Sequence, residues 1–271
     1  MTTKAAWPPE VDRVARLVER VQLPSARQQK WVAIAGGPGS GKTTLASCVK
    51  QRLEAEGLRV CVVPMDGYHF YRRELDAMPD PAHAHAKRGA PFTFNAPRLL
   101  EDLAVARRRG EGLFPSFDHA RGDPVEGDVE LRSDADVVLV EGLYLMLREA
   151  PWNRLLELFD VGVFVRCAEP EQRRRIIARH MAAGRTGAAD RADNNDLPNG
   201  RFVNENSQVE AAGVEIVEST PRWQSQSGGS ASAGAGGGSG GGGDAATLLC
   251  SRHAARTTAL IALAACFARR W

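Results

Sequence analysis

GGPGSGKTT, at residues 36–44, is the most specific pattern in this sequence. It satisfies G-x-x-x-x-G-K-[ST] and follows the apolar run WVAIA at residues 31–35, so a buried strand leads into it. Glycines let successive backbone N–H groups point at phosphate oxygens, and the helix that begins near Lys42 adds its positive dipole end. The pattern therefore predicts a phosphate-binding loop rather than a glycine-rich turn without a ligand. The candidate cofactor-binding residues are Gly36, Gly37, Pro38, Gly39, Ser40, Gly41, Lys42, Thr43 and Thr44.

The same loop predicts its cofactors, ATP and Mg²⁺. The Lys42 ammonium reaches the β- and γ-phosphates in such loops, and the Thr43 hydroxyl binds the metal. The run DVVLVEG at 136–142 brings Glu141 to the carboxyl end of a strand, where an acidic residue approaches the metal. Glu141 could instead only cap backbone N–H groups. A dinucleotide fingerprint fails because Lys42 stands where its third glycine is required.

Runs rich in valine and isoleucine recur along the chain and alternate with helical patterns such as TTLASCVKQRLEAEG at 43–57. This alternation predicts an α/β fold with a parallel five-stranded sheet flanked by helices. An amphipathic helix is expected near the start of the chain and another from Pro97 to Arg109, with Gly110 after it. The five predicted strands are 31–35, 59–65, 136–142, 160–166 and 213–219.

Composition divides the chain into one domain and a tail. We predict a folded domain over residues 1–223, with an insertion at about 68–134 that covers a ligand. Residues 224–246 are rich in Gly, Ser and Ala, which predicts a flexible tail. Residues 247–271 form an extension to which we assign no role.

The charge balance excludes several classes of partner. The 35 basic and 33 acidic residues give a net charge of +2, which favours neither nucleic acid nor an anionic membrane.

Five scattered cysteines without a C-x-x-C pair suit a reducing compartment, and no apolar run is long enough to cross a bilayer. We expect a cytoplasmic protein whose partner is a small molecule.

A second carboxylate follows the second predicted strand. PMDGYHF at 64–70 brings Asp66 to the sheet edge that carries the phosphate-binding loop, and Gly67 allows a sharp exit. Phosphoryl transfer to an alcohol uses a carboxylate that orients the hydroxyl and accepts its proton. Asp66 is therefore a candidate catalytic base, although it could also serve only as a turn-former.

These motifs, taken in order, resemble the uridine kinase, phosphoribulokinase and pantothenate kinase group, especially its uridine-kinase-like nucleoside/nucleotide kinases. The resemblance covers about residues 25–220. It implies a P-loop NTPase fold, with Asp66 as the catalytic aspartate, Glu141 as the Walker B acid and the insertion as the substrate-recognition region. The agreeing motifs are GGPGSGKTT, PMDGYHF, KRGAPFTFN at 87–95, FPSFDHARGDPV at 114–125, DVVLVEGLYLML at 136–147 and NNDLPNGRFV at 194–203.

The insertion holds stacking and hydrogen-bonding groups suited to a polar substrate. A solvated basic turn, or a passive surface histidine, would explain several of them equally well. The candidate substrate-binding residues are Tyr68, His69, Arg88, Phe117, Asp118, His119 and Arg121.

The segment at about 169–203 resembles the lid of these kinases. In AEPEQRRRIIARH at 168–180 the arginines would close over the transferring phosphate, for which their planar charged forks are suited. Arg174 and Arg179 lie five residues apart and need not face the same ligand. We therefore favour Arg174 and Arg175 as catalytic with Lys42, against a solvated face, and expect NNDLP to border the adenine.

The sequence thus predicts ATP-dependent phosphorylation of a hydroxyl on a small molecule, with a nucleoside as the leading substrate. A sugar or a pantothenate-like alcohol remains open. A nucleotide-binding switch protein without phosphotransfer is the rival from another class, and Asp66 with the arginines of the lid argues against it.

Overall fold

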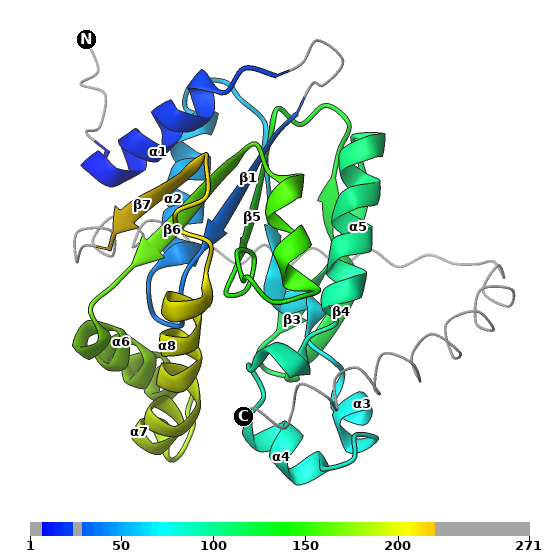
Figure 1. Ribbon diagram of the computed structural model, residues 1–271, viewed down its shortest axis with the longest axis vertical. Helices are drawn as coiled ribbons and strands as arrows, with labels where there is room; N and C mark the ends of the chain where they lie inside the picture. The colour runs from blue at the N-terminus through cyan, green and yellow to red at the C-terminus, as the bar shows by residue number, and fades with distance from the viewer. Residues whose placement is uncertain (1–6, 24–28, 220–271) are drawn as a thin grey trace, which may run out of the picture.

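A computed structural model of the chain describes residues 7–23 and 29–219 (Figure 1). Its centre is a five-stranded sheet with strand order β2-β5-β1-β6-β7, in which every neighbouring pair is parallel. The predicted sheet is therefore confirmed. The strands are β1 Lys30–Ala35, β2 Val60–Pro64, β5 Val137–Gly142, β6 Val161–Arg166 and β7 Val214–Glu218.

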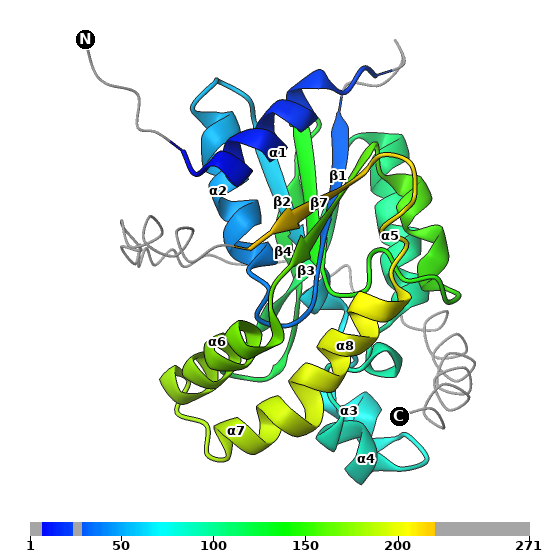
Figure 2. The same ribbon diagram turned by 60° about the vertical axis from the view of Figure 1, so that its left-hand side comes forward.

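Helices cover both faces of the sheet (Figure 2). Helices α1 (Pro9–Arg20) and α2 (Lys42–Glu54) bury one face, where Val32 and Ile34 of β1 pack among their apolar side chains. Helix α5 (Ala96–Arg109) covers the other face, to which Ala33 and Ala35 point. Because side chains alternate along a strand and both faces are buried, β1 is apolar at nearly every position. The short turns η3 (Trp152–Arg154) and η4 (Leu156–Leu158) lie beside α5.

The insertion between β2 and β5 is more ordered than the sequence predicts. It contains the predicted helix α5, whose N-cap Asn95 accepts a hydrogen bond from Arg98 N, and also an antiparallel hairpin that sequence analysis missed. The hairpin packs against η1 so closely that a Cβ on Gly67 would lie 2.0 Å from Pro115 O. The other elements are η1 Met65–Tyr68, α3 Arg72–Asp76, α4 Pro81–Ala86, η2 Pro91–Thr93, β3 Gly112–Asp118 and β4 Asp123–Leu131.

The segment expected to be the lid is helical throughout most of its length. It comprises α6 (Glu169–Ala182), α7 (Ala188–Arg191), the π-helix η5 (Ala192–Asp196) and α8 (Leu197–Asn206). His180 Nε2 lies 2.9 Å from Asp196 Oδ2, and Ile176 packs against Ala192 and Leu197. These contacts join α6 to η5 and α8, so the segment is braced as one unit.

The tail at 224–246 and the extension at 247–271 lie outside the described residues, as do the last positions of the predicted domain. Within residues 7–23 and 29–219, no helix is both long and apolar enough to span a membrane.

Candidate active site

The phosphate-binding loop joins β1 to α2 as its pattern predicts, and α2 begins at Lys42. Gly39 and Gly41 have φ of +71° and +97°, the left-handed region that favours glycine. Gly36 is required for another reason, because a Cβ there would lie 2.6 Å from Val165 O of β6. The loop is therefore held against the carboxyl end of the sheet, with the N-terminus of α2 behind it.

Glu141 lies beside this loop at the end of β5, where it pairs in register with Ile34. The Thr43 hydroxyl donates a hydrogen bond to Glu141 Oε1 over 3.1 Å. Burial raises the pKa of the Glu141 carboxyl, Lys42 opposes that rise, and the Asp66 carboxylate adds to it. Asp66 and Lys42 are therefore near enough to Glu141 for their charges to act on it.

The donor set fits a magnesium nucleotide. A hydroxyl and a carboxylate are hard oxygen ligands of the kind that Mg²⁺ prefers, and Thr43 and Glu141 already touch. Among the described residues no group of three or more His, Cys, Asp or Glu could hold a metal by itself. Mg²⁺ sites commonly have one or two protein ligands, and phosphate oxygens and water complete the coordination.

A cavity of about 550 Å³ opens from the phosphate-binding loop and brings five parts of the chain together. Asp66 lines it from η1, so the predicted base and the loop share one cavity. The hairpin and helix α6 supply two further walls. The lining residues are Gly39, Gly41, Lys42, Thr43, Thr44, Pro64, Asp66, Ser116, Phe117, His119, Glu141, Arg175, Ile176 and Arg179.

The arginines of α6 divide into two groups. Arg175 lines the cavity, and its Nη1 donates to Ser219 Oγ at 2.8 Å and, over 3.4 Å, to the carbonyls of Gly39 and Ser40. Its Nη2 is buried with no hydrogen-bond partner among the described residues. Arg174 does not line the cavity, and its guanidinium pairs on the surface with Glu171, at 2.6 and 2.7 Å. Glu171 also accepts from Arg175 Nε at 2.7 Å, so the two arginines differ in exposure and in access to the cavity.

Arg179 reaches the cavity although sequence analysis did not favour it. It lines the cavity four residues after Arg175, and its charge lowers the pKa of Glu141. Residues four apart lie on one helical face, whereas adjacent residues point about 100° apart. Helical periodicity was therefore the signal that could have selected Arg175 with Arg179 instead of Arg174 with Arg175.

Three of the predicted substrate residues gather beside Asp66. Phe117 and His119 line the cavity, and the His69 ring lies 4.8 Å from the Phe117 ring and 3.8 Å from that of Phe94. His69 Nδ1 lies 2.9 Å from the Asp66 carbonyl oxygen, an acceptor, so Nδ1 carries the proton. Burial lowers the pKa of His69, which keeps the ring neutral and leaves Nε2 as an acceptor.

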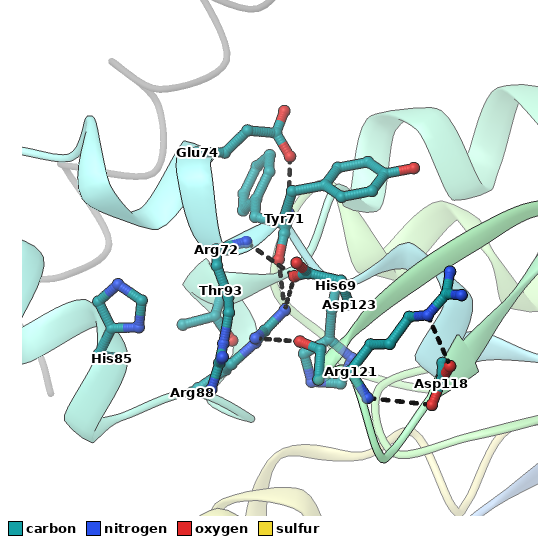
Figure 3. A network of polar contacts seen from close by, with 12 residues as sticks. His69, Tyr71, Arg72, Glu74, His85, Arg88, Thr93, Asp118, Arg121 and Asp123 are labelled. Carbon is teal, nitrogen blue, oxygen red and sulfur yellow. Dashed lines mark hydrogen bonds and ion pairs between the residues drawn. The ribbon is translucent and has the colours of Figure 1, made fainter.

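The other four substrate candidates do not line the cavity and have protein partners. Tyr68 is 1% exposed and donates its hydroxyl to Asp102 of α5, so it belongs to the core. Asp118 accepts from two backbone N–H groups of the hairpin turn and pairs with the exposed Arg121 (Figure 3). Arg88 is held by protein groups of the insertion (Figure 3). Side-chain type alone could not reveal these partners.

The segment expected to border the adenine makes different contacts. Asn195 Nδ2 donates to Arg88 O at 2.9 Å, and Asn194 O accepts from Lys87 Nζ at 3.0 Å. In this structure NNDLP therefore lies against the insertion.

A phosphate-binding loop, a strand-end glutamate, an aspartate in the same cavity and a helix that carries arginines to it are the parts expected of a P-loop kinase. The model of the Phosphoribulokinase / Uridine kinase family matches residues 31–188. The chain belongs to this family and is an ATP-dependent kinase.

Relatives agree with this assignment. A Schizosaccharomyces pombe protein named, provisionally, uridine kinase C227.14 is 34% identical over 209 residues, which cover 73% of this chain and 88% of the relative. The uncharacterised protein YggC of Escherichia coli is 30% identical over 206 residues, 74% of this chain and 84% of YggC. The crystal structure of a Silicibacter sp. TM1040 protein, provisionally assigned as a fructose transport system kinase, has a TM-score of 0.69 and 28% identity over 76% of this chain and 98% of its own.

Proposed function

We propose that this kinase transfers the γ-phosphoryl group of Mg-ATP to a hydroxyl of a nucleoside. One observation carries the proposal: Asp66, Phe117 and His119 line the cavity that begins at the phosphate-binding loop. A carboxylate facing that loop can take the proton of an acceptor hydroxyl. An aromatic ring beside it offers a face on which a nucleobase can stack.

Each residue then has a distinct task. Bound Mg-ATP supplies the phosphoryl group, and its metal neutralises the charge on the phosphate oxygens. Lys42 would contact the β- and γ-phosphates of bound ATP, while the Thr43 hydroxyl and the Glu141 carboxylate would hold the Mg²⁺ ion. Asp66 orients the acceptor hydroxyl and accepts its proton as the oxygen attacks.

The arginines of the lid complete the site. Arg175 and Arg179 line the same cavity, and their planar guanidinium groups suit the equatorial oxygens of the phosphoryl group in flight. The unpartnered Nη2 of Arg175 supports this role, because a buried donor without a partner is costly until a ligand oxygen satisfies it.

Two relatives bear on the choice of acceptor. The S. pombe relative carries the name of a uridine kinase, which supports a nucleoside. The Silicibacter relative carries a name from fructose transport, which supports a sugar as the second candidate. The Phe117 ring favours the nucleoside, because stacking on a base uses a larger flat surface than a sugar offers.

An acceptor panel tests the proposal. Purified protein with Mg-ATP is offered uridine, cytidine, fructose, glycerate and pantothenate, and both ADP and the phosphorylated product are measured. We expect uridine or cytidine to give ADP formation roughly 10²-fold above hydrolysis without acceptor, within the usual contribution of a general base and positioning. Product formed only with fructose would transfer the proposal to the sugar. The Asp66→Asn variant is the matched control and should lose the acceptor-dependent part.

We further propose that the protein acts in the cytoplasm on small molecules, without nucleic-acid or membrane partners. The near-neutral net charge of +2 supports this, as do the free thiols of Cys48, Cys61 and Cys167 among the described residues.

A further inference from the structure

The Arg88 side chain ties together separate parts of the insertion (Figure 3). Its guanidinium donates to Phe70 O at 2.7 Å, to Gly122 O, and to Asp123 Oδ1 at 3.2 Å. Only 11% of the side chain is exposed. Arg88 thereby fixes the turn of the β3–β4 hairpin to the segment that follows η1.

That hairpin lines the cavity on the side where the proposed function places the acceptor hydroxyl. The Arg88 guanidinium lies 5.3 Å from the centre of the Phe117 ring, which in turn contacts the His69 ring. His69 donates its Nδ1–H to the carbonyl oxygen of Asp66. A continuous set of contacts therefore runs from Arg88 to the proposed base.

The backbone of the same residue faces the lid. The Arg88 carbonyl oxygen accepts from Asn195 Nδ2 at 2.9 Å and from Arg191 Nη2 at 3.4 Å. Lys87 Nζ adds a bond to Asn194 O at 3.0 Å. All three partners lie in α7 and the π-helix η5, and single π-helical turns are frequent at functional sites.

The lid carries this connection back to the phosphate side. Asp196 at the end of η5 contacts His180 of α6 at 2.9 Å and Arg179 at 3.8 Å. Arg175 and Arg179 are on that same helix and line the cavity. The position of the two arginines is therefore linked to the turn that holds the acceptor pocket.

We propose that Arg88 is a positioning residue that couples closure of the lid to formation of the acceptor pocket. The Arg88 side chain binds the hairpin turn, and the Arg88 carbonyl oxygen accepts hydrogen bonds from the lid. We call the contacts of Lys87 and Arg88 with residues 191–195 the latch, which joins the insertion to the lid. The proposal rests on the proposed function in taking the hairpin as the acceptor side. If the acceptor pocket is disordered, the arginines of the lid then lose their fixed position as well. Loss of the latch makes both the hairpin and the lid more mobile.

The first experiment needs no acceptor. Amide hydrogen exchange is measured on the full chain for Asn195→Leu, which keeps the side-chain size and removes the donor, and for Lys87→Met. Loss of one hydrogen bond should speed exchange roughly five- to tenfold in the latch region. We expect faster exchange in both the lid at 188–206 and the hairpin at 112–124. Acceleration confined to the lid in both variants would overturn the proposal.

Arg173→Met is the matched control. Arg173 pairs with Asp193 at 2.7 and 2.8 Å on the exposed surface of the lid, and among the described residues both of these hydrogen bonds stay within the lid. Its loss should affect exchange in the lid alone. If Asn195→Leu does not fold, Lys87→Met decides the question, because Lys87 is only partly buried and methionine keeps most of its length.

A kinetic measurement separates positioning from general damage. With uridine as the probe, the latch variants should raise the KM for uridine roughly tenfold while the ATP dissociation constant stays within about twofold. Equal losses for both ligands would mean a structural role only and would overturn the proposal. If uridine is not phosphorylated by the wild-type protein, the nucleoside proposal fails, and hydrogen exchange still decides whether the latch exists.

Discussion

Arg174 and Arg179 form a natural matched pair for testing the site. Both belong to α6, and their side chains are 61% and 60% exposed. Arg174 forms an ion pair with Glu171 at 2.6 Å, whereas Arg179 lies 3.8 Å from Asp196 and lines the cavity. An exposed ion pair contributes about 0.2–1 kcal/mol, so substitution of either residue should lower the melting temperature by no more than about 4 °C.

Catalysis should separate the two variants. A donor that stabilises charge only in the transition state contributes roughly 10²–10³-fold to turnover. Arg179→Met is therefore expected to lower kcat by about that factor, while Arg174→Met changes it by less than roughly twofold, the effect of a remote surface change. Initial rates are measured at saturating ATP with the acceptor that the panel identifies, together with ATP affinity by calorimetry. Equal kcat values for the two variants would refute a catalytic role for Arg179. A loss of kcat in Arg174→Met alone would instead support Arg174 as the catalytic arginine, as the sequence predicted.

Three further predictions concern single residues. Asp66→Asn keeps shape and hydrogen-bonding capacity but removes the base, so transfer should fall roughly 10²–10⁴-fold with ATP affinity nearly unchanged; near-normal transfer in a coupled ADP assay would contradict it. Burial raises the pKa of the Glu141 carboxyl in the folded protein above its ordinary value of about 4.3, so at pH values above that value its charged form lowers the free energy of unfolding. In thermal scans of the ligand-free protein, Glu141→Gln should melt at least about 2 °C higher at pH 7, with the gain vanishing near pH 4; a gain independent of pH would contradict this sign. Gly67→Ala places a Cβ 2.0 Å from Pro115 O and should cost at least about 2 kcal/mol by chemical denaturation, and an unchanged midpoint would show that η1 and the hairpin can separate.

Much of the fold follows from local sequence. The three central strands β1, β5 and β6 are buried on both faces, so their apolar runs mark them without any knowledge of their neighbours. Helix α5 is marked at both ends, by the Asn95 cap and by Gly110 in the left-handed conformation. The hairpin lacked such signals, because Pro115 and Pro124 argue against strands and the pairing shifts between Phe114 and Ser116.

The candidate site also contains some residues that could be predicted from local sequence and others that could not. Residues of the phosphate-binding loop could be predicted because backbone conformation and phosphate chemistry together restrict each position. Tyr68 and Arg88 could not, since the Asp102 carboxylate and the Phe70 and Gly122 carbonyls that engage them come from distant positions. A tyrosine or arginine near a catalytic aspartate is equally suited to substrate and to the fold, and only tertiary contacts distinguish the two.

The π-helix η5 in the lid constrains the number of residues between α7 and α8. Residues 188–206 form a nearly continuous helical segment in which η5 has a wider turn than its neighbours. Such a turn holds one residue more than an α-helical turn, so deleting one residue there would restore α-helical geometry and leave the direction of α8 nearly unchanged. Gly200, whose Cα would lie 3.1 Å from a Cβ on Gly37 of the phosphate-binding loop, would keep its place, whereas the contacts of Asn194 and Asn195 with the insertion would change. In an alignment such an event is a one-residue gap, so relatives that share the latch are expected to preserve the spacing from Arg191 to Gly200 even where the intervening residues differ.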